Sequence, residues 1–236
     1  DFAHYHLQSS LHFAQQKLQF GIGNLDHGFK HISSLFFLMS LNYLPFFEYY
    51  LFNLTNFLFL FFFIIFILQE IFYKKFFSSN LVRILLCFLL ILFLTKFSRL
   101  AEYGSDISGQ IIISYYIFFI AELIFNKNIS FEKKILYLKV SLILIVFAIS
   151  FKFILAIYSI LILLLLYFIN EKKRVILNLF NYKFLLAIFL PILFLIFFNF
   201  SSTGCLLYPV NSTCFSNTYD WAVPSEVVNY LNFYYE

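Results

Sequence analysis

The stretch "FLFLFFFIIFIL" (residues 57–68) contains no polar side chain, and "LILLLLYFIN" (161–170) is almost as apolar. Over the 236 residues, 62% are hydrophobic and 12% are charged, and the mean hydropathy is +0.88. A soluble domain has about half apolar and about a quarter charged residues. The composition therefore excludes a soluble globular protein and predicts an integral membrane protein.

Apolar runs of about 20 residues, the length that crosses a bilayer, recur along the chain. As one helix, residues 135–170 would be about 54 Å long, whereas a hydrocarbon core is about 30 Å thick. Lys152 is the charge in the middle of this stretch, so we expect a break at residues 150–152. The expected membrane spans are at about residues 51–69, 81–97, 110–126, 135–151, 152–170 and 184–200.

The basic residues set the orientation of these spans, because cytoplasmic loops carry an excess of Lys and Arg. We place the loops 70–80, 127–134 and 171–183 in the cytoplasm, which puts nine of the 16 basic residues there. The polar segments at both ends of the sequence, and Lys152, then lie on the extracytoplasmic face. The nine residues are Lys74, Lys75, Lys127, Lys133, Lys134, Lys172, Lys173, Arg174 and Lys183.

The short apolar run "SSLFFLMSLNYL" (33–44) cannot cross and, on this topology, begins and ends on the extracytoplasmic face. We therefore predict an all-α, polytopic helical membrane protein with a short interfacial helix and an extracytoplasmic polar face. Its expected parts are an extracytoplasmic first loop (1–50), a transmembrane helical bundle (51–200) and an extracytoplasmic tail (201–236). Because the sequence begins with Asp and no signal-peptide region precedes the polar stretch, we expect an internal fragment of a longer protein.

The polar opening stretch holds the first candidate site residues. Asp1 and His6 are candidates for a functional site, and solvated groups of an interfacial loop are the alternative. A divalent cation held by Asp1, His4 and His6 is a weaker alternative, because a His-x-His spacing is poorly specific for metal.

A Gly-x-Gly follows in "GIGNL" (21–25). It lacks the third Gly and the strand–helix context of a dinucleotide fingerprint. The glycines are more typical of a turn, in which Asn24 and Asp26 form local hydrogen bonds. A contact of Asn24 and Asp26 with substrate is the alternative.

A second group of polar residues interrupts the apolar bundle. Arg99, Glu102 and Asp106 lie in a short loop between spans, where they either contact substrate or form a helix cap and ion pairs. Lys152 lies between two apolar runs, and such a charge is costly unless it is paired or lines a wet cavity. Its alternative is to extend to the membrane surface. Glu122 lies near the cytoplasmic end of its span, where a structural role is favoured.

The tail contains two cysteines, Cys205 and Cys214, on the extracytoplasmic face. In that oxidising location they either form a disulfide or remain two thiols.

Several motifs together resemble a family of bacterial polytopic membrane proteins. The resemblance covers nearly the whole chain, and the family is related to the C-superfamily (GT-C-like) of lipid-linked-sugar glycosyltransferases. The motifs that carry it are Asp-x3-Tyr-His (1–6), "FGIGNLDHGF" (20–29), "EYGSDISGQ" (102–110), the intramembrane Lys152, Tyr208-Pro209 and "YDWAVP" (219–224).

The resemblance implies a reaction and a site. Enzymes of this superfamily place an Asp in the first extracytoplasmic loop, and Asp1, followed by Tyr5 and His6, lies at the matching place. The protein would transfer a hexosyl sugar from a polyprenyl-phosphate donor to a cell-envelope glycan or lipid acceptor, on the extracytoplasmic side of the bacterial inner membrane. The carboxylate would act as general base on the acceptor hydroxyl, and Lys152 or Arg99 would stabilise the departing phosphate. The donor is a lipid, so neither a nucleotide fold nor a nucleic-acid partner is expected.

Six of these residues are expected to converge on one extracytoplasmic cavity: Asp1, His6, Arg99, Glu102, Asp106 and Lys152. Other functions remain open, namely a polysaccharide polymerase, a lipid or solute transporter, and a non-catalytic membrane assembly subunit. A transporter would need polar residues along both halves of its spans, whereas the polar residues of this chain gather on one face.

Overall fold

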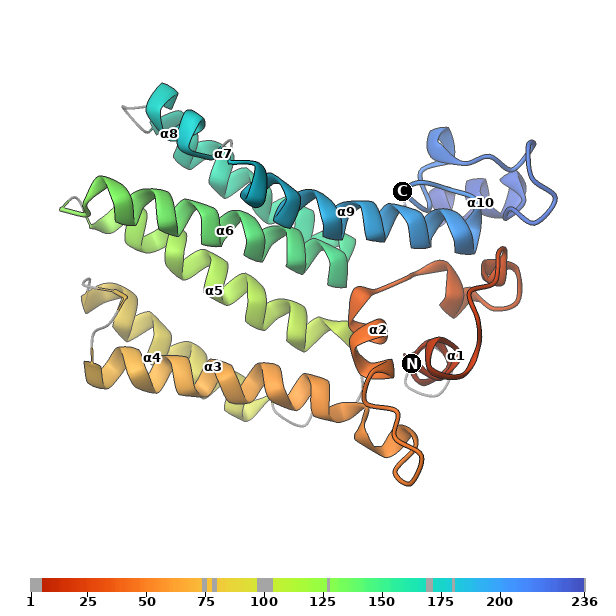
Figure 1. Cartoon of the computed structure of the whole chain (residues 1–236), viewed down its shortest axis with the longest axis horizontal. Coiled ribbons are helices and arrows are strands. Elements are labelled where there is room, and N and C mark those ends of the chain that lie inside the picture. The colour runs from red at the N-terminus through yellow and green to blue at the C-terminus, as the bar shows by residue number, and fades with distance from the viewer. Residues whose placement is uncertain are drawn as a thin grey trace. The chain divides into compact units, whose positions relative to one another are not determined.

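The computed structural model describes residues 6–73, 76–77, 80–96, 104–126, 128–168, 172–179 and 181–235 (Figure 1). Within these ranges the regular structure is helical, and the β-type pairings are two isolated bridges, Leu44–Glu48 and Cys205–Cys214. The all-α prediction is therefore confirmed. The chain divides into two compact units, which we call the terminal unit (up to Thr55 and from Ile192 onward) and the central unit (Asn56–Pro191).

The central unit contains the apolar helices, and α3 and α9 each continue across its boundary into the terminal unit. Four helical segments among the described residues are long and apolar enough to cross a membrane: Tyr49–Tyr73, Ser105–Phe125, Phe131–Phe151 and Tyr182–Thr203. These segments are what is expected of an integral membrane protein. The helices are α3 (Asn53–Tyr73), α4 (Asn80–Thr95), α5 (Ser105–Phe125), α6 (Phe131–Phe151), the 3₁₀ helix η6 (Phe153–Tyr158), α7 (Ser159–Phe168), α8 (Lys172–Leu179) and α9 (Tyr182–Thr203).

Two of the six expected spans form, within the described residues, helices that are shorter than the other four. The run expected at 81–97 forms α4, which has 16 residues and is about 24 Å long at 1.5 Å per residue. The run expected at 152–170 is divided between η6, with six residues, and α7, with ten.

Side-chain contacts nevertheless show that the chain runs back and forth within the central unit. The rings of Phe63 on α3 and Phe93 on α4 pack edge to face with centroids 5.2 Å apart, so α4 returns along α3. Near the start of α5, Ser108 Oγ donates to Asn56 Oδ1 of α3 over 2.7 Å. Helices α3 and α5 therefore begin at the same end of the unit.

Helix α6 runs antiparallel to α5, and the two lie side by side (Figure 1). Lys152, directly after α6, is paired with Asp106 in the first turn of α5. At the other end, Arg174 of α8 lies over the ring of Phe131, the first residue of α6, at 4.2 Å. The segment η6–α7 thus carries the chain from one end of α6 to the other. We call the end with Asn56, Asp106 and Lys152 the Lys152 end, and the opposite end the basic end.

The expected break in the long apolar run is confirmed at its predicted place. Helix α6 ends at Phe151, and Lys152 has an extended backbone with φ −151° and ψ 115°. The chain then resumes as η6. The Tyr116 hydroxyl of α5 donates to the carbonyl oxygen of Tyr158 over 2.8 Å, at the junction of η6 with α7.

The terminal unit is built from short helices around the last turns of α9. Residues 33–44, predicted not to cross, contain α2 (Ser34–Ser40), whose seven residues are too few for a membrane span. Ser33 caps α2 by accepting a hydrogen bond from the backbone of Leu35, and Leu35, Phe36 and Met39 are fully buried. The other elements are α1 (Leu7–Gln15), η2 (Ile22–Asn24), η3 (His27–Lys30), η4 (Tyr49–Leu51), η7 (Asn211–Thr213) and α10 (Ser225–Tyr235).

Two segments far apart in the sequence are joined in this unit. The Gly21 N–H donates to the carbonyl oxygen of Ser201 over 2.8 Å, at the end of α9. Gly21 has φ +77°, and a Cβ there would come within 2.6 Å of the Trp221 carbonyl oxygen. A Cβ on Gly23 would come within 2.9 Å of the Ser202 carbonyl oxygen. Both glycines are therefore needed for close backbone approach.

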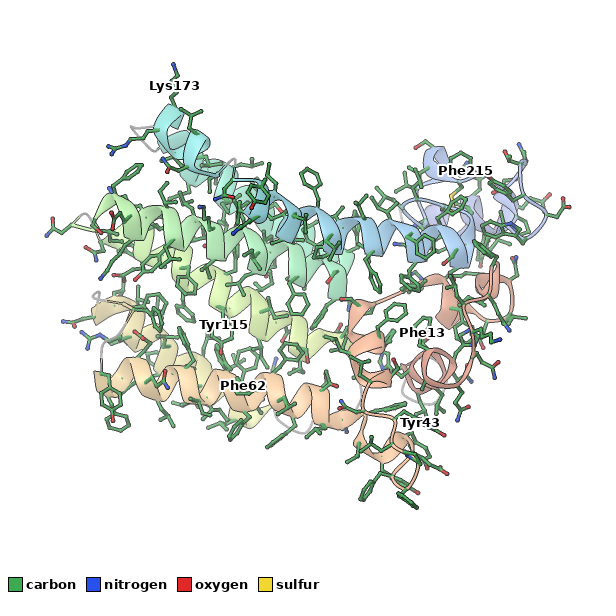
Figure 2. The ribbon with its side chains drawn as sticks, viewed as in Figure 1. Phe13, Tyr43, Phe62, Tyr115, Lys173 and Phe215 are labelled. Carbon is green, nitrogen blue, oxygen red and sulfur yellow. A yellow bond between two sulfur atoms is a disulfide. The ribbon has the colours of Figure 1, made fainter. Side chains whose placement is uncertain are left out.

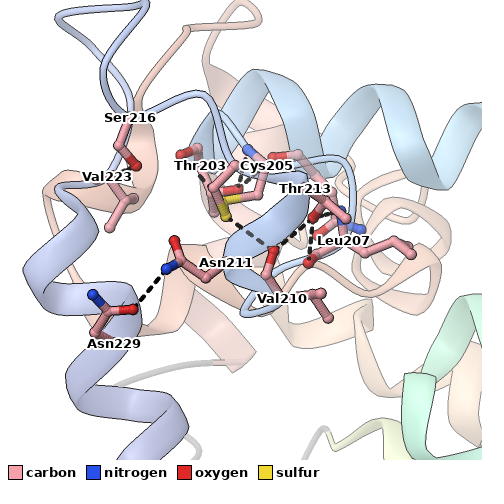
Figure 3. Close-up of a disulfide and its surroundings, with 11 residues drawn as sticks. Thr203, Cys205, Leu207, Val210, Asn211, Thr213, Ser216, Val223 and Asn229 are labelled. Atoms are coloured by element: carbon pink, nitrogen blue, oxygen red, sulfur yellow. Dashed lines mark hydrogen bonds between the residues drawn. A yellow bond between two sulfur atoms is a disulfide. The ribbon is translucent and has the colours of Figure 1, made fainter.

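The tail after α9 is closed by a disulfide between Cys205 and Cys214 (Figure 3). Thr213 holds the same loop, because its hydroxyl accepts from the Leu207 N–H over 3.1 Å and lies 2.8 Å from the Val210 carbonyl oxygen. Of the two alternatives for the cysteines, the structure has the disulfide.

Candidate functional site

The structure brings together two of the predicted site residues, Asp106 and Lys152, at the Lys152 end of the central unit. Their side chains form an ion pair between Lys152 Nζ and Asp106 Oδ1. The side chains are 46% and 59% exposed, respectively, so the pair is open to solvent or lipid headgroups. A charge between apolar segments is less costly when it is paired in this way.

Local structure explains why these two residues face one another. Asp106 lies in the first turn of α5, and Lys152 is the C-cap residue of α6. A carboxylate is stabilised at a helix N-terminus and a cation at a helix C-terminus, because of the helix dipole. The N-cap of α5 is Gly104, which makes no side-chain capping bond, so neither Ser105 nor Asp106 is the N-cap residue.

A buried polar contact supports the pair from within the bundle. Ser108 and Asn56, which are hydrogen-bonded to each other, are 0% and 1% exposed. This contact fixes the start of α5 against α3, and with it the position of Asp106 one half-turn earlier. Chemically, the site offers one cation and one carboxylate at the end of an apolar bundle, where an anionic headgroup could exchange with Asp106 as the partner of Lys152.

The sequence-predicted residues of the terminal unit have structural contacts. The His6 ring lies 5.6 Å from the ring of Phe36. Asn24 Nδ2 donates to the Trp221 carbonyl oxygen over 2.8 Å, and Asp26 caps η3 by accepting from the Gly28 N–H over 3.0 Å. The contact of Asp26 matches the turn interpretation. The local hydrogen bond expected of the Asn24 side chain is wrong, because its partner Trp221 lies 197 positions away in the sequence. Both side chains are exposed.

The other predicted residues lie outside the described ranges: Asp1, His4, Tyr5, Arg99 and Glu102. The general base and the expected convergence of six residues on one cavity therefore stay predictions. Among the residues that the structure describes, no three His, Cys, Asp or Glu side chains are close enough to hold a metal ion. Two of the three residues of the suggested metal site, Asp1 and His4, are not among them.

Comparison with known protein families shows to which family this chain belongs. The family described as "Domain of unknown function (DUF8201)" matches residues 1–235. The chain belongs to the DUF8201 family. Neither a curated protein nor a solved structure matches it.

The DUF8201 chain also contains a buried carboxylate that was not predicted from the sequence. Glu70, near the end of α3, is 0% exposed and accepts hydrogen bonds from two backbone N–H groups, those of Phe76 and Phe77, over 2.9–3.1 Å. The Tyr137 hydroxyl donates to the Phe76 carbonyl oxygen over 2.6 Å. Glu70 therefore holds the α3–α4 connection at the basic end. A carboxylate at the end of an apolar run was the available signal.

Proposed function

We propose that the protein is a membrane glycosyltransferase that transfers a sugar from a polyprenyl-phosphate donor to a cell-envelope glycan or lipid acceptor. The observation that carries the proposal is the Asp106–Lys152 pair. Lipid-linked sugar transfer requires a cation near the membrane surface, where a lipid phosphate departs. Lys152 meets this requirement, and Asp106 holds its ammonium group until the phosphate arrives.

The proposed site lies on the extracytoplasmic side of the inner membrane. Two features support this orientation. The basic end of the central unit carries Lys133, Lys173 and Arg174, as the positive-inside rule requires of a cytoplasmic face. The terminal unit contains the Cys205–Cys214 disulfide, and disulfides persist in oxidising compartments. The short α2 would lie at the same membrane surface as an interfacial helix.

In the proposed reaction, Asp1 removes the proton of the acceptor hydroxyl as that oxygen attacks the anomeric carbon of the donor sugar. The bond between the anomeric carbon and the phosphate oxygen breaks, and the polyprenyl phosphate leaves with the bonding electrons. Lys152 stabilises the negative charge that develops on this phosphate. Arg99 and Glu102 are the further residues proposed to contact substrate.

Transfer of radiolabelled hexose from a polyprenyl-phosphate donor, measured with the full-length protein in membranes, tests the proposal. Lys152→Ala should lower the rate about 10²-fold, the usual effect of removing one transition-state-stabilising group. Lys96→Ala is the matched control, because Lys96 is an exposed lysine at the end of α4. Asp1→Asn should abolish transfer while membrane insertion persists. Equal rates for the Lys152→Ala and Lys96→Ala proteins would refute the role of Lys152, and wild-type transfer by Asp1→Asn would refute the base.

A non-catalytic assembly subunit is the second candidate. It is favoured by the contacts of "GIGN" (21–24) with Trp221, because these residues, which contributed to the family resemblance, hold the terminal unit together. The absence of sugar transfer by the wild-type protein with any hexose donor, in membranes that retain its native lipids, would favour this candidate.

A further inference from the structure

A pocket of about 180 Å³ lies in the terminal unit. It is formed where α1 ends and the following loop turns back, with walls from α2 and the last turns of α9. Its apolar lining includes Phe13, Phe37 and Phe198, and its polar lining includes Gln16, Lys17 and Gln19. No role assigned above uses these residues.

The size of the pocket matches a single ring. Sites for drug-sized ligands have about 300–1,000 Å³, which is more than this pocket offers. An apolar cavity of about 150 Å³ holds one benzene molecule. With about 180 Å³, the pocket has room for one six-membered ring with small substituents.

The floor of the pocket is aromatic. Phe13 (Figure 2) stacks on Phe37 with ring centroids 4.0 Å apart and an interplanar angle of 21°. Phe37 also contacts Phe198 of α9, with centroids 4.2 Å apart. These mutual contacts fix the three rings in place, so the surface that they present is rigid. An aromatic surface of this kind takes an apolar face of C–H groups, as one side of a pyranose ring provides.

The rim of the pocket is polar and can form many hydrogen bonds. Gln16 and Gln19 are both exposed, and each side-chain amide has two N–H donors and a carbonyl acceptor. Burial lowers the pKa of His12, which also lines the pocket, so its imidazole is mostly neutral at pH 7. A neutral imidazole donates from one nitrogen and accepts at the other. This combination suits hydroxyl groups, which both donate and accept.

We propose that this pocket binds one hexopyranose residue of a glycan, with C–H groups of the sugar against the aromatic lining and its hydroxyl groups on Gln16 and Gln19. An apolar ring would form no hydrogen bond with the exposed amides of Gln16 and Gln19, whereas the hydroxyl groups of a sugar would. A phosphate would be bound by Lys17 but would leave the aromatic floor unused. The inference deepens the proposed function, on which it rests for the view that the protein handles a glycan.

The test is binding of methyl α-D-glucopyranoside, methyl α-D-mannopyranoside and methyl α-D-galactopyranoside to the whole protein in nanodiscs free of glycoside detergent. Saturation-transfer difference NMR detects weak binding of this kind. At least one glycoside should bind, with the strongest transfer to its ring C–H protons. The double variant Gln16→Ala/Gln19→Ala should weaken binding at least tenfold. Gln8→Ala should not, because Gln8 is an exposed residue of α1 that does not line the pocket.

Two results would overturn the assignment: no glycoside binds the wild-type protein, or the double variant binds as well as the Gln8→Ala protein. Phenol or inorganic phosphate that binds while all three glycosides fail would likewise show that the pocket takes another ligand. Methyl glycosides carry no lipid phosphate and are not donors. Their binding therefore does not depend on whether the protein transfers sugar, and failure of the transfer reaction leaves the expected binding result unchanged.

Discussion

Replacing Glu70 with alanine should destabilise the central unit, because this buried carboxylate is the acceptor for the Phe76 and Phe77 N–H groups. Truncation removes one partner from two hydrogen bonds. Leaving a buried donor without its acceptor costs about 1–3 kcal/mol each, which sets a range of about 2–6 kcal/mol. Phe77 is 0% exposed, whereas Phe76 is half-buried and its N–H can more easily reach water.

Two effects place the expected loss in the lower part of that range. Water at Phe76 replaces some of the lost interaction, and alanine removes the desolvation cost of keeping a carboxylate in an apolar environment. We therefore expect about 2–4 kcal/mol in the free energy of unfolding. Glu70→Gln should lose less, because its amide oxygen still accepts one hydrogen bond.

The assay is unfolding in mixed micelles of increasing SDS fraction, followed by circular dichroism, together with hydrogen exchange of the Phe77 amide. Glu132→Ala is the matched control, because Glu132 is an exposed carboxylate in the first turn of α6, also at the basic end. The reasoning is wrong if Glu70→Ala unfolds at the same SDS fraction as Glu132→Ala, or if its Phe77 amide stays as protected as in the wild type.

Three further outcomes are expected. Gly204→Ala should prevent normal packing of the tail, because Gly204 has φ +75° and its Cβ would come within 2.3 Å of the Ala222 Cβ; limited proteolysis should then cut the tail, and wild-type resistance would contradict this. Burial lowers the pKa of His12, so its contribution to stability is complete above the unfolded pKa of about 6.5 and is lost as the pH falls through the lower folded value. The melting temperature should therefore fall less between pH 7.5 and pH 5 for His12→Gln than for the wild type, and equal falls would count against this prediction. In a Cys87→Ser background, an impermeant thiol reagent added outside should label Asp220→Cys but not Lys133→Cys, and the reverse pattern would invert the proposed topology.

Much of the helical scaffold could be predicted from the sequence, because the signals are local. Apolar runs of the right length gave the four long helices, and the charge of Lys152 marked the break after α6. For the ion pair, the sequence predicted only that Lys152 needs a partner. Its partner, Asp106, follows from the antiparallel packing of α5 and α6, which hydropathy does not specify.

The least predictable part was the terminal unit. "GIGNL" (21–25) carries a turn signal, but nothing in its sequence indicates that its backbone packs on α9 and Trp221. Such a contact depends on the path of all the helices between the two segments.

The joining of distant segments in the terminal unit has a consequence for biosynthesis. The Asn24–Trp221 hydrogen bond spans 197 residues of sequence, and ribosomes add about 5–20 residues per second. The segment around Asn24 therefore waits about 10–40 s between its own synthesis and that of its partner, while the apolar helices between the two segments are inserted. During this interval the Gly21 and Gly23 backbone lacks its native contacts, so a chaperone or the translocation machinery would have access to this segment.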